Sequence, residues 1–144
     1  MRIALGSDER GELPATLERA LENAGHTVML FGALAPGDDD AWPSVGQSVG
    51  EAVASGRCAT GIVCCWTGTG VSIAANKVRG VRAALCGDAA TASGARTWND
   101  ANVLALSMRA TTPTVGEEIL NAWLSGAPTA DDRYRGMIET LRDK

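Results

Sequence analysis

The sequence predicts an α/β fold in which five parallel strands form a sheet between two layers of helices. Short apolar runs recur along the chain, and between them apolar residues recur at helical spacing. Strand–helix alternation of this kind is typical of a parallel sheet with helices on both faces. With 144 residues, the chain has room for one such domain, spanning residues 1–144. We therefore expect a three-layer α/β/α sandwich.

The five expected strands are the apolar runs at residues 2–5, 27–31, 61–64, 82–85 and 103–106. They do not alternate with polar residues, so we expect each strand to be buried on both faces. The first helix is expected between the first two strands and ends at Gly25, and the second ends before Gly56. Further helices are expected from about residue 71, over 88–96 and 114–124, and from about residue 131.

The segment at residues 33–41 contains a Pro-Gly pair and three consecutive aspartates. Such a segment cannot extend the core, and it is either a solvated loop or a flap over a site.

The composition excludes several classes of partner. Thirteen Lys and Arg against 17 Asp and Glu give a net charge of −4. A negative net charge does not favour binding to the phosphates of a nucleic acid. No apolar run approaches the roughly 18–20 residues of a membrane span, and no signal peptide is evident at the N-terminus. We therefore expect a cytoplasmic protein that contacts neither nucleic acid nor membrane.

The cysteines do not form a metal-binding pattern. The chain has four cysteines and one histidine, and no Cys-x-x-Cys pair. We expect reduced thiols, no metal site and no cofactor.

Two segments follow expected strands and carry polar residues, one at residues 6–11 and one at residues 65–70. Ligands in open α/β sheets bind beyond the carboxyl ends of the strands. If the first and third strands are neighbours, Asp8 and Cys65 lie at one crevice. The Gly68-Thr69-Gly70 turn leads into a helix, so its amides can hold an anion. A turn of this composition also fits an ordinary strand–helix connection.

Several strings occur in one order along the chain: GSD at 6–8, GIVCC at 61–65, TGTG at 67–70, SIAANK at 72–77 and NDANVLAL at 99–106. In these strings the chain resembles the ribose-5-phosphate isomerase B family, which includes the galactose-6-phosphate isomerase subunits. The resemblance implies a Rossmann-like five-stranded sheet, and a homodimer or dimer of dimers with its sites at the subunit interface. It also implies interconversion of aldose and ketose phosphates without a metal.

The resemblance also implies roles for individual residues. Cys65 matches the base that removes a proton next to the substrate carbonyl and gives an enediolate. Thr67 and the amides of the turn match groups that stabilise the enediolate oxygen. The expected substrate-binding positions are Asp8, Glu9, Trp42, Trp66, Gly68, Thr69, Gly70, Trp98, Asn99, Arg109 and Arg133. Asp8 is also a candidate cap of the first helix.

The chain departs from the family at three positions that contact the sugar or its phosphate. Glu9 replaces a histidine that helps hold the phosphate, Trp98 replaces the ring-opening histidine, and Met137 replaces an arginine. A phosphate loses about 1.5–3 kcal/mol with each charge-assisted hydrogen bond removed. We therefore expect a non-phosphorylated or otherwise unusual substrate.

Three of the four tryptophans occupy positions that line the pocket in the family. These are Trp42, Trp66 and Trp98, whereas Trp123 is expected in the core or at an interface. Together they suggest an aromatic-lined pocket, and the simpler interpretation is that they are separate core residues.

Three functions are compatible with these residues. The first is proton-transfer isomerisation at Cys65 on a changed sugar. The second is different chemistry on a bulkier apolar ligand. The third is ligand binding without catalysis, which the retention of Cys65, Thr67, Asp8 and Asn99 disfavours.

Overall fold

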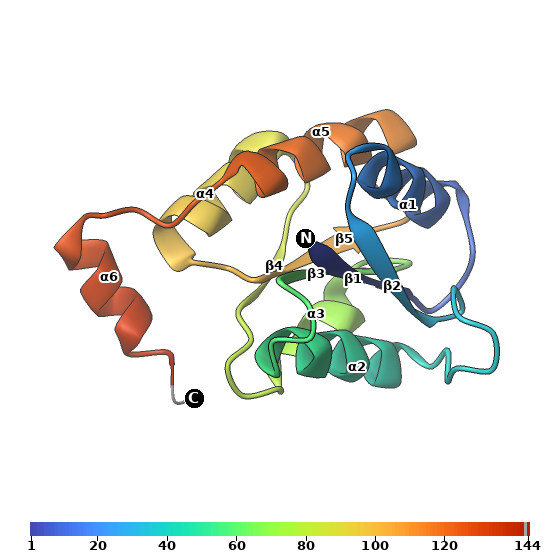
Figure 1. The fold of residues 1–144 in the computed structure, drawn as a ribbon, viewed down its shortest axis with the longest axis horizontal. Coiled ribbons are helices and arrows are strands. Elements are labelled where there is room, and N and C mark those ends of the chain that lie inside the picture. Colours follow the sequence, from blue (N-terminus) through green and yellow to red (C-terminus); the bar gives the residue numbers. More distant parts are fainter. Residues whose placement is uncertain (143) are drawn as a thin grey trace.

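The computed structural model describes residues 1–142 and 144, and within them it forms a five-stranded sheet and six helices (Figure 1). The strands are β1 (Arg2–Ser7), β2 (Thr27–Gly32), β3 (Thr60–Cys65), β4 (Ala83–Leu85) and β5 (Val103–Ser107). The helices are α1 (Glu12–Asn23), α2 (Trp42–Ala54), α3 (Thr69–Asn76), α4 (Ala89–Asn99), α5 (Pro113–Ser125) and α6 (Asp132–Glu139).

The sheet is parallel throughout, with the order β2-β1-β3-β5-β4. Helices α1, α4 and α5 cover one face and α2 and α3 cover the other (Figure 1). The expected three-layer α/β/α sandwich is therefore confirmed. β1 and β3 are neighbours, and Ser7 at the end of β1 lies opposite Cys64 near the end of β3. The condition under which Asp8 and Cys65 lie at one crevice is therefore met.

Two strands are less buried than we expected. β1, β3 and β5 are almost entirely buried, but β2 and β4 are only partly buried because they form the two edges of the sheet. β4 begins at Ala83 and not at Arg82. The Arg82 amide donates to the Asn102 side chain (2.7 Å) and its guanidinium pairs with Asp100 (3.2 Å).

The helices agree with the sequence pattern apart from small shifts at their ends. α1 and α2 end just before Gly25 and Gly56, and α3 begins at Thr69, two residues earlier than expected. Trp123 belongs to the core: it is 1% exposed, and its indole N–H donates to the Thr60 hydroxyl at 3.0 Å.

Most of the segment at residues 33–41 is exposed, and its aspartates bind backbone amides. Asp38 accepts from the Gly32 amide (3.0 Å), and Asp39 accepts from the Ala41 amide (3.0 Å) and the Ser44 hydroxyl (2.6 Å). These hydrogen bonds fix the conformation of the loop just before α2, whose first residue is Trp42. In the part of the chain that the structure describes, no helix is long and apolar enough to cross a membrane.

Candidate active site

Cys65 is the last residue of β3, at the carboxyl edge of the sheet. Its carbonyl accepts from the Met108 amide at 3.0 Å, which ties the end of β3 to the loop after β5. The Cys65 side chain is 6% exposed. The residue lines a hollow of about 350 Å³ together with Asp8, Trp42, Trp66, Thr67, Thr69 and Gly70. The structure thus brings Cys65 together with six of the other expected site residues.

The turn between β3 and α3 leaves amide groups free at the start of the helix. Gly68 has a φ of 75°, a left-handed conformation that glycine adopts without strain, and no side chain caps the helix. The Thr67 and Thr69 hydroxyls lie 2.7 Å apart and form a hydrogen bond. This arrangement is suited to stabilising negative charge on a bound oxygen.

Asp8 faces Cys65 from the end of β1. Its amide donates to the Cys64 carbonyl at 3.4 Å, and the buried Ser7 hydroxyl donates to the Glu9 carbonyl at 2.6 Å. The Asp8 Oδ1 atom is buried and has no hydrogen-bond partner among the described residues. Asp8 does not cap α1, which begins after Gly11 without a side-chain cap. Since Asp8 borders the Cys65 hollow, its carboxylate is suited to accept from a substrate hydroxyl there.

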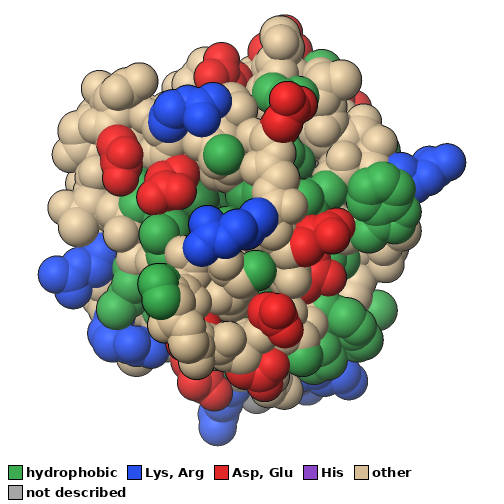
Figure 2. All heavy atoms as spheres, turned by 90° about the vertical axis from the view of Figure 1, so that its right-hand side faces the viewer, with side chains coloured by type: hydrophobic (Ala, Val, Ile, Leu, Met, Phe, Trp, Pro, Cys, Tyr) green, Lys and Arg blue, Asp and Glu red, His purple; other side chains and the backbone are tan. Residues whose placement is uncertain are grey.

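Acidic residues surround Asp8 on the side away from Cys65. A second hollow, of about 510 Å³, lies between the ends of β1 and β2 and is lined by Asp8, Glu9, Arg10, Asp38 and Asp40. Burial, followed by the charges of Glu9 and Asp40, raises the pKa of Asp8. Figure 2 views the molecule from the right-hand side of Figure 1, and on this face acidic and basic side chains lie among apolar ones. The carboxylates of this hollow oppose an anion, and Arg10 is the one basic side chain among its lining residues.

Sequence reasoning did not identify Asp38 and Asp40 as part of this region. The sequence contains one indication of this acidic region, because the three aspartates directly follow a Pro-Gly pair in the loop after β2. Their approach to Asp8 depends on the path of the loop, which the composition alone does not determine.

Two of the expected tryptophans line the Cys65 hollow. The Trp42 ring packs closely against Gly70, since a methyl group on Gly70 would lie 2.9 Å from two of its carbons. The Trp66 carbonyl accepts from the Arg109 amide (2.9 Å) and the Ser107 hydroxyl (3.0 Å). Both indoles are about half exposed, at 45% and 58%. They are therefore pocket walls and not core residues.

Arg109 lies on the other side of Thr67 from the Cys65 hollow. It lines a third hollow, of about 350 Å³, with Thr67, Leu85, Cys86, Gly87, Ser107, Ala110 and Thr111. Thr67 borders both hollows. Arg109 is therefore separated from the acidic side by the Cys65 hollow, whereas Arg10 borders the acidic hollow itself.

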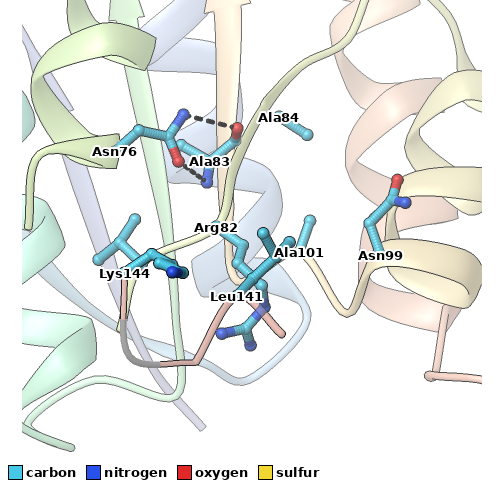
Figure 3. Close-up of a pocket in the computed structure, with 9 residues that line it drawn as sticks. Asn76, Arg82, Ala83, Ala84, Asn99, Ala101, Leu141 and Lys144 are labelled. Atoms are coloured by element: carbon cyan, nitrogen blue, oxygen red, sulfur yellow. Dashed lines mark hydrogen bonds between the residues drawn. The ribbon is translucent and has the colours of Figure 1, made fainter. Parts of the chain in front are cut away.

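Three expected site residues lie far from Cys65 within one chain. Trp98 and Asn99 end α4 and precede β5, so they lie at the amino edge of the sheet. Asn99 lines a separate hollow near Ala83 and Leu141 (Figure 3). Arg133 is exposed on α6, at the far end of the molecule from the ends of β1 and β2 (Figure 1). The expected cluster of three tryptophans therefore does not form within a single chain.

The other three thiols are in surroundings that keep them protonated. Burial raises the pKa of Cys64 to about 12 and that of Cys86 to about 11, and it also raises the pKa of Cys58. All four cysteines are free and buried in the structure. Among residues 1–142 and 144, no group of three or more His, Cys, Asp or Glu residues is placed to hold a metal ion.

The fold and this crevice are typical of α/β proteins that bind a small ligand at the carboxyl edge of the sheet. The family model described as "Ribose/Galactose Isomerase" matches residues 3–141. The chain is 39% identical over 141 residues to ribose-5-phosphate isomerase B of Escherichia coli, covering 97% of this chain and 93% of that protein. It is 38% identical over 125 residues to D-erythrulose-4-phosphate isomerase of Pectobacterium atrosepticum, covering 86% and 82%.

Solved structures give the same result. The chain matches ribose-5-phosphate isomerase B of Clostridium thermocellum with a TM-score of 0.91 and 38% identity, covering 99% of this chain and 95% of that one. The chain belongs to the ribose/galactose isomerase family of sugar phosphate isomerases. It is therefore an isomerase, as the resemblance implied.

Proposed function

We propose that the chain interconverts an aldose and a ketose, with the Cys65 thiolate as the base. The observation that carries this proposal is the hollow that Cys65 shares with Asp8, Thr67 and the first residues of α3. The thiolate takes the proton from the carbon next to the carbonyl, and the proton then returns to the neighbouring carbon. Thr67 and the amides of Gly68, Thr69 and Gly70 stabilise the charge that develops on the enediolate oxygen.

The proposed substrate is a non-phosphorylated or otherwise unusual sugar, because the charges beside Asp8 oppose a phosphate. Glu9, Asp38 and Asp40 outnumber Arg10 in the hollow on this side of the site. The Asp8 carboxylate, which borders the Cys65 hollow, is suited to accept from a sugar hydroxyl. Trp42 and Trp66 offer flat apolar faces on which the C–H face of a sugar can stack. Arg109, beyond Thr67, is placed for any acidic group at the other end of the substrate.

We further propose that a second copy of the chain completes the site. Trp98, Asn99 and Arg133 lie away from Cys65 within one chain, so they act at the site only if a partner supplies them. The resemblance implies this arrangement in a homodimer. Exposed apolar side chains near the crevice, Trp66, Ile73 and Leu85, are suited to packing against the partner. With four free thiols, the cytoplasm is the proposed location.

The relatives described above are all named as isomerases of phosphorylated sugars, so the phosphate is the feature to vary in the test. The name of the Pectobacterium relative makes a four-carbon sugar a further candidate. No observation favours different chemistry on a bulkier ligand, or binding without catalysis.

The test measures aldose–ketose conversion by NMR with ribose, erythrose and their terminal phosphates, for the wild type and Cys65→Ala. We expect the non-phosphorylated member of each pair to be the better substrate. For ribose 5-phosphate we expect kcat/KM below about 10⁴ M⁻¹s⁻¹, the lower end for ordinary enzymes. A value at or above that figure would show that the substrate proposal is wrong. Full activity of Cys65→Ala would remove the proposed base.

A further inference from the structure

We propose that Asp39 is a positioning residue for the Cys65 hollow. Its carboxylate fixes the first turn of α2, and this turn holds the Trp42 indole against Gly70 at the wall of the hollow. That this wall affects the reaction rests on the proposed function. That Asp39 holds the start of α2 rests only on the contacts within the chain.

The three consecutive aspartates of the loop before α2 have different contacts. Asp38 and Asp40 border the acidic hollow, whereas the Asp39 side chain turns to α2. Its Oδ1 atom accepts from the Ala41 amide at 3.0 Å, and its Oδ2 atom accepts from the Ser44 hydroxyl at 2.6 Å. One carboxylate therefore joins the loop to the first turn of the helix at two points.

The start of α2 depends on Asp39 because the usual cap is missing. The N-cap residue is Ala41, which has no side-chain acceptor for the first amides of the helix. Asp39 compensates from two residues upstream, since it binds both the Ala41 amide and a side chain of the first turn. The Ser44 hydroxyl, followed by the Ala41 amide, lowers the pKa of Asp39. The carboxylate therefore stays ionised near neutral pH and keeps both hydrogen bonds.

Trp42 needs a fixed backbone because burial alone does not hold it. The residue is the first of α2, and its side chain is 45% exposed. The indole packs closely against Gly70, where a methyl group would lie 2.9 Å from two of its carbons. Both residues line the Cys65 hollow. A change in the direction of the chain at Trp42 would therefore move one wall of the candidate site.

The rest of α2 is held without Asp39. Val45 and Val49 are buried in the core, and Gly46 packs against the Ala74 side chain of α3. Loss of the Asp39 carboxylate should therefore leave the helix and the core in place and loosen only the first turn. This expectation separates a positioning role from a general contribution to stability.

Fluorine NMR of protein labelled with 5-fluorotryptophan measures the position of each indole, with the four resonances assigned by Trp→Phe variants. Asp39→Ala should shift or broaden the Trp42 resonance and leave those of Trp98 and Trp123, which lie away from the hollow, unchanged. The matched control is Glu51→Ala, which removes the same charge from an exposed position of α2, nine residues along the helix. The control should leave all four resonances unchanged. A Trp42 resonance that stays the same in Asp39→Ala would overturn the proposal.

Kinetics then measure the effect on the reaction, with whichever of ribose, erythrose and their terminal phosphates the wild type converts fastest. Asp39→Ala should raise KM about 2–10-fold, which corresponds to the net contribution of a hydrogen bond, and change kcat less than about twofold. Cys65 and Thr67 are untouched by this change. Ser44→Ala, which loses one of the two hydrogen bonds, should raise KM by less. A KM equal to that of the wild type, or a fall in kcat at constant KM, would contradict the proposal.

Asp39→Asn tests whether hydrogen bonding or charge is responsible. An asparagine keeps an oxygen for the Ala41 amide, and its NH₂ group can donate to the Ser44 hydroxyl. This variant should therefore lie between the wild type and Asp39→Ala, both in KM and in the Trp42 resonance. If it is as impaired as Asp39→Ala, the charge and not the pair of hydrogen bonds is responsible, and the proposal is wrong.

A double-mutant cycle tests whether Asp39 acts through Trp42. In Trp42→Ala, the further change Asp39→Ala should alter KM by less than about twofold, because the side chain that Asp39 positions is already gone. Two fully independent effects on KM would place the action of Asp39 elsewhere and overturn the proposal. Cys65→Ala tests the proposed function separately. If it keeps the wild-type activity, the proposed base is wrong while the cycle still decides the role of Asp39. If the wild type converts none of these sugars, the proposed function fails and the fluorine resonance decides whether Asp39 holds Trp42.

Discussion

Cys64 and Cys65 are neighbours in sequence but have opposite surroundings. Successive strand residues point to opposite faces of the sheet, so the Cys64 side chain packs between the sheet and α1 and α5. Cys65 packs on the other face, at the hollow that contains Asp8 and Thr67. The alternation of a strand therefore assigns one thiol to the core and the other to the site.

Replacement of Cys64 should affect stability and leave the chemistry in place. Cys64 is fully buried, so Cys64→Ala removes packing contacts and should lower the free energy of unfolding by about 1–2 kcal/mol. Urea unfolding measures this loss, with Cys65→Ala as the matched control at the next position. A larger loss of stability in Cys65→Ala than in Cys64→Ala would contradict the assignment of the two faces.

Asp8→Asn should stabilise the fold near neutral pH. The pKa of Asp8 is raised in the folded state, chiefly by burial, so the folded protein favours the protonated form. The stability that this group contributes is complete below its unfolded pKa of about 3.9 and is lost as the pH rises through the folded value. The neutral asparagine avoids that loss. Unfolding of the wild type and Asp8→Asn at pH 7 and pH 3 should give a difference only at pH 7. A difference of equal size at both values would exclude this cause.

At the scale of elements, the closest packing in the α2–α3 layer depends on a glycine. A methyl group on Gly46 of α2 would lie 2.6 Å from the Ala74 side chain and 2.8 Å from the Val71 carbonyl oxygen of α3. The two helices therefore approach at a distance that excludes a side chain at this position. Since α3 begins with Thr69 and Gly70, which line the Cys65 hollow, this contact also positions the amides at the start of α3.

Gly46→Ala should lower the free energy of unfolding by about 1–3 kcal/mol, because it forces α2 and α3 apart. The matched control is Gly136→Ala on α6, where a methyl group meets nothing within 4 Å. Thermal unfolding should show the control unchanged or slightly stabilised, since alanine favours a helix more than glycine does. Equal destabilisation of both variants would mean that helix propensity, and not the approach of α2 to α3, decides the result.

The edge strand β4 is protected by a side chain from the end of α3. The Asn76 amide donates to the Ala83 carbonyl (3.0 Å) and accepts from the Ala83 amide (2.8 Å), as Figure 3 shows. Both backbone groups of Ala83 that face away from β5 are therefore satisfied. The SIAANK string indicated the family, but the role of its asparagine at the sheet edge required the structure.

The five strands and the three layers could be predicted from the sequence, and so could the meeting of Asp8 with Cys65 on the condition that the first and third strands are neighbours. These features follow from buried strands alternating with helices, because parallel strands end at one edge. The full strand order required the structure. The acidic surroundings of Asp8 could not be predicted in the same way, since they depend on how the 33–41 loop folds back. The distance of Trp98 from Cys65 in a single chain depends on which edge of the sheet the end of α4 reaches.

For the whole molecule, we expect a homodimer. The candidate site lies at the carboxyl edge of the sheet, and Trp98 and Asn99 lie at the amino edge, so one chain cannot bring them together. Size-exclusion chromatography with light scattering at micromolar concentration should give at least twice the mass of the chain. A stable monomer that is fully active would contradict the proposal that a partner supplies these residues.

The central claim is that Cys65 moves a carbon-bound proton of the substrate, and conversion in D₂O tests it most directly. NMR of an open-chain aldose, 4-O-methyl-D-erythrose, should show conversion to the ketose with deuterium at the carbon that receives the proton. Cys65→Ala should carry out this exchange at least about 100-fold more slowly, with its fold retained. Exchange and conversion at the wild-type rate in folded Cys65→Ala would contradict the account, because another group would then be the base.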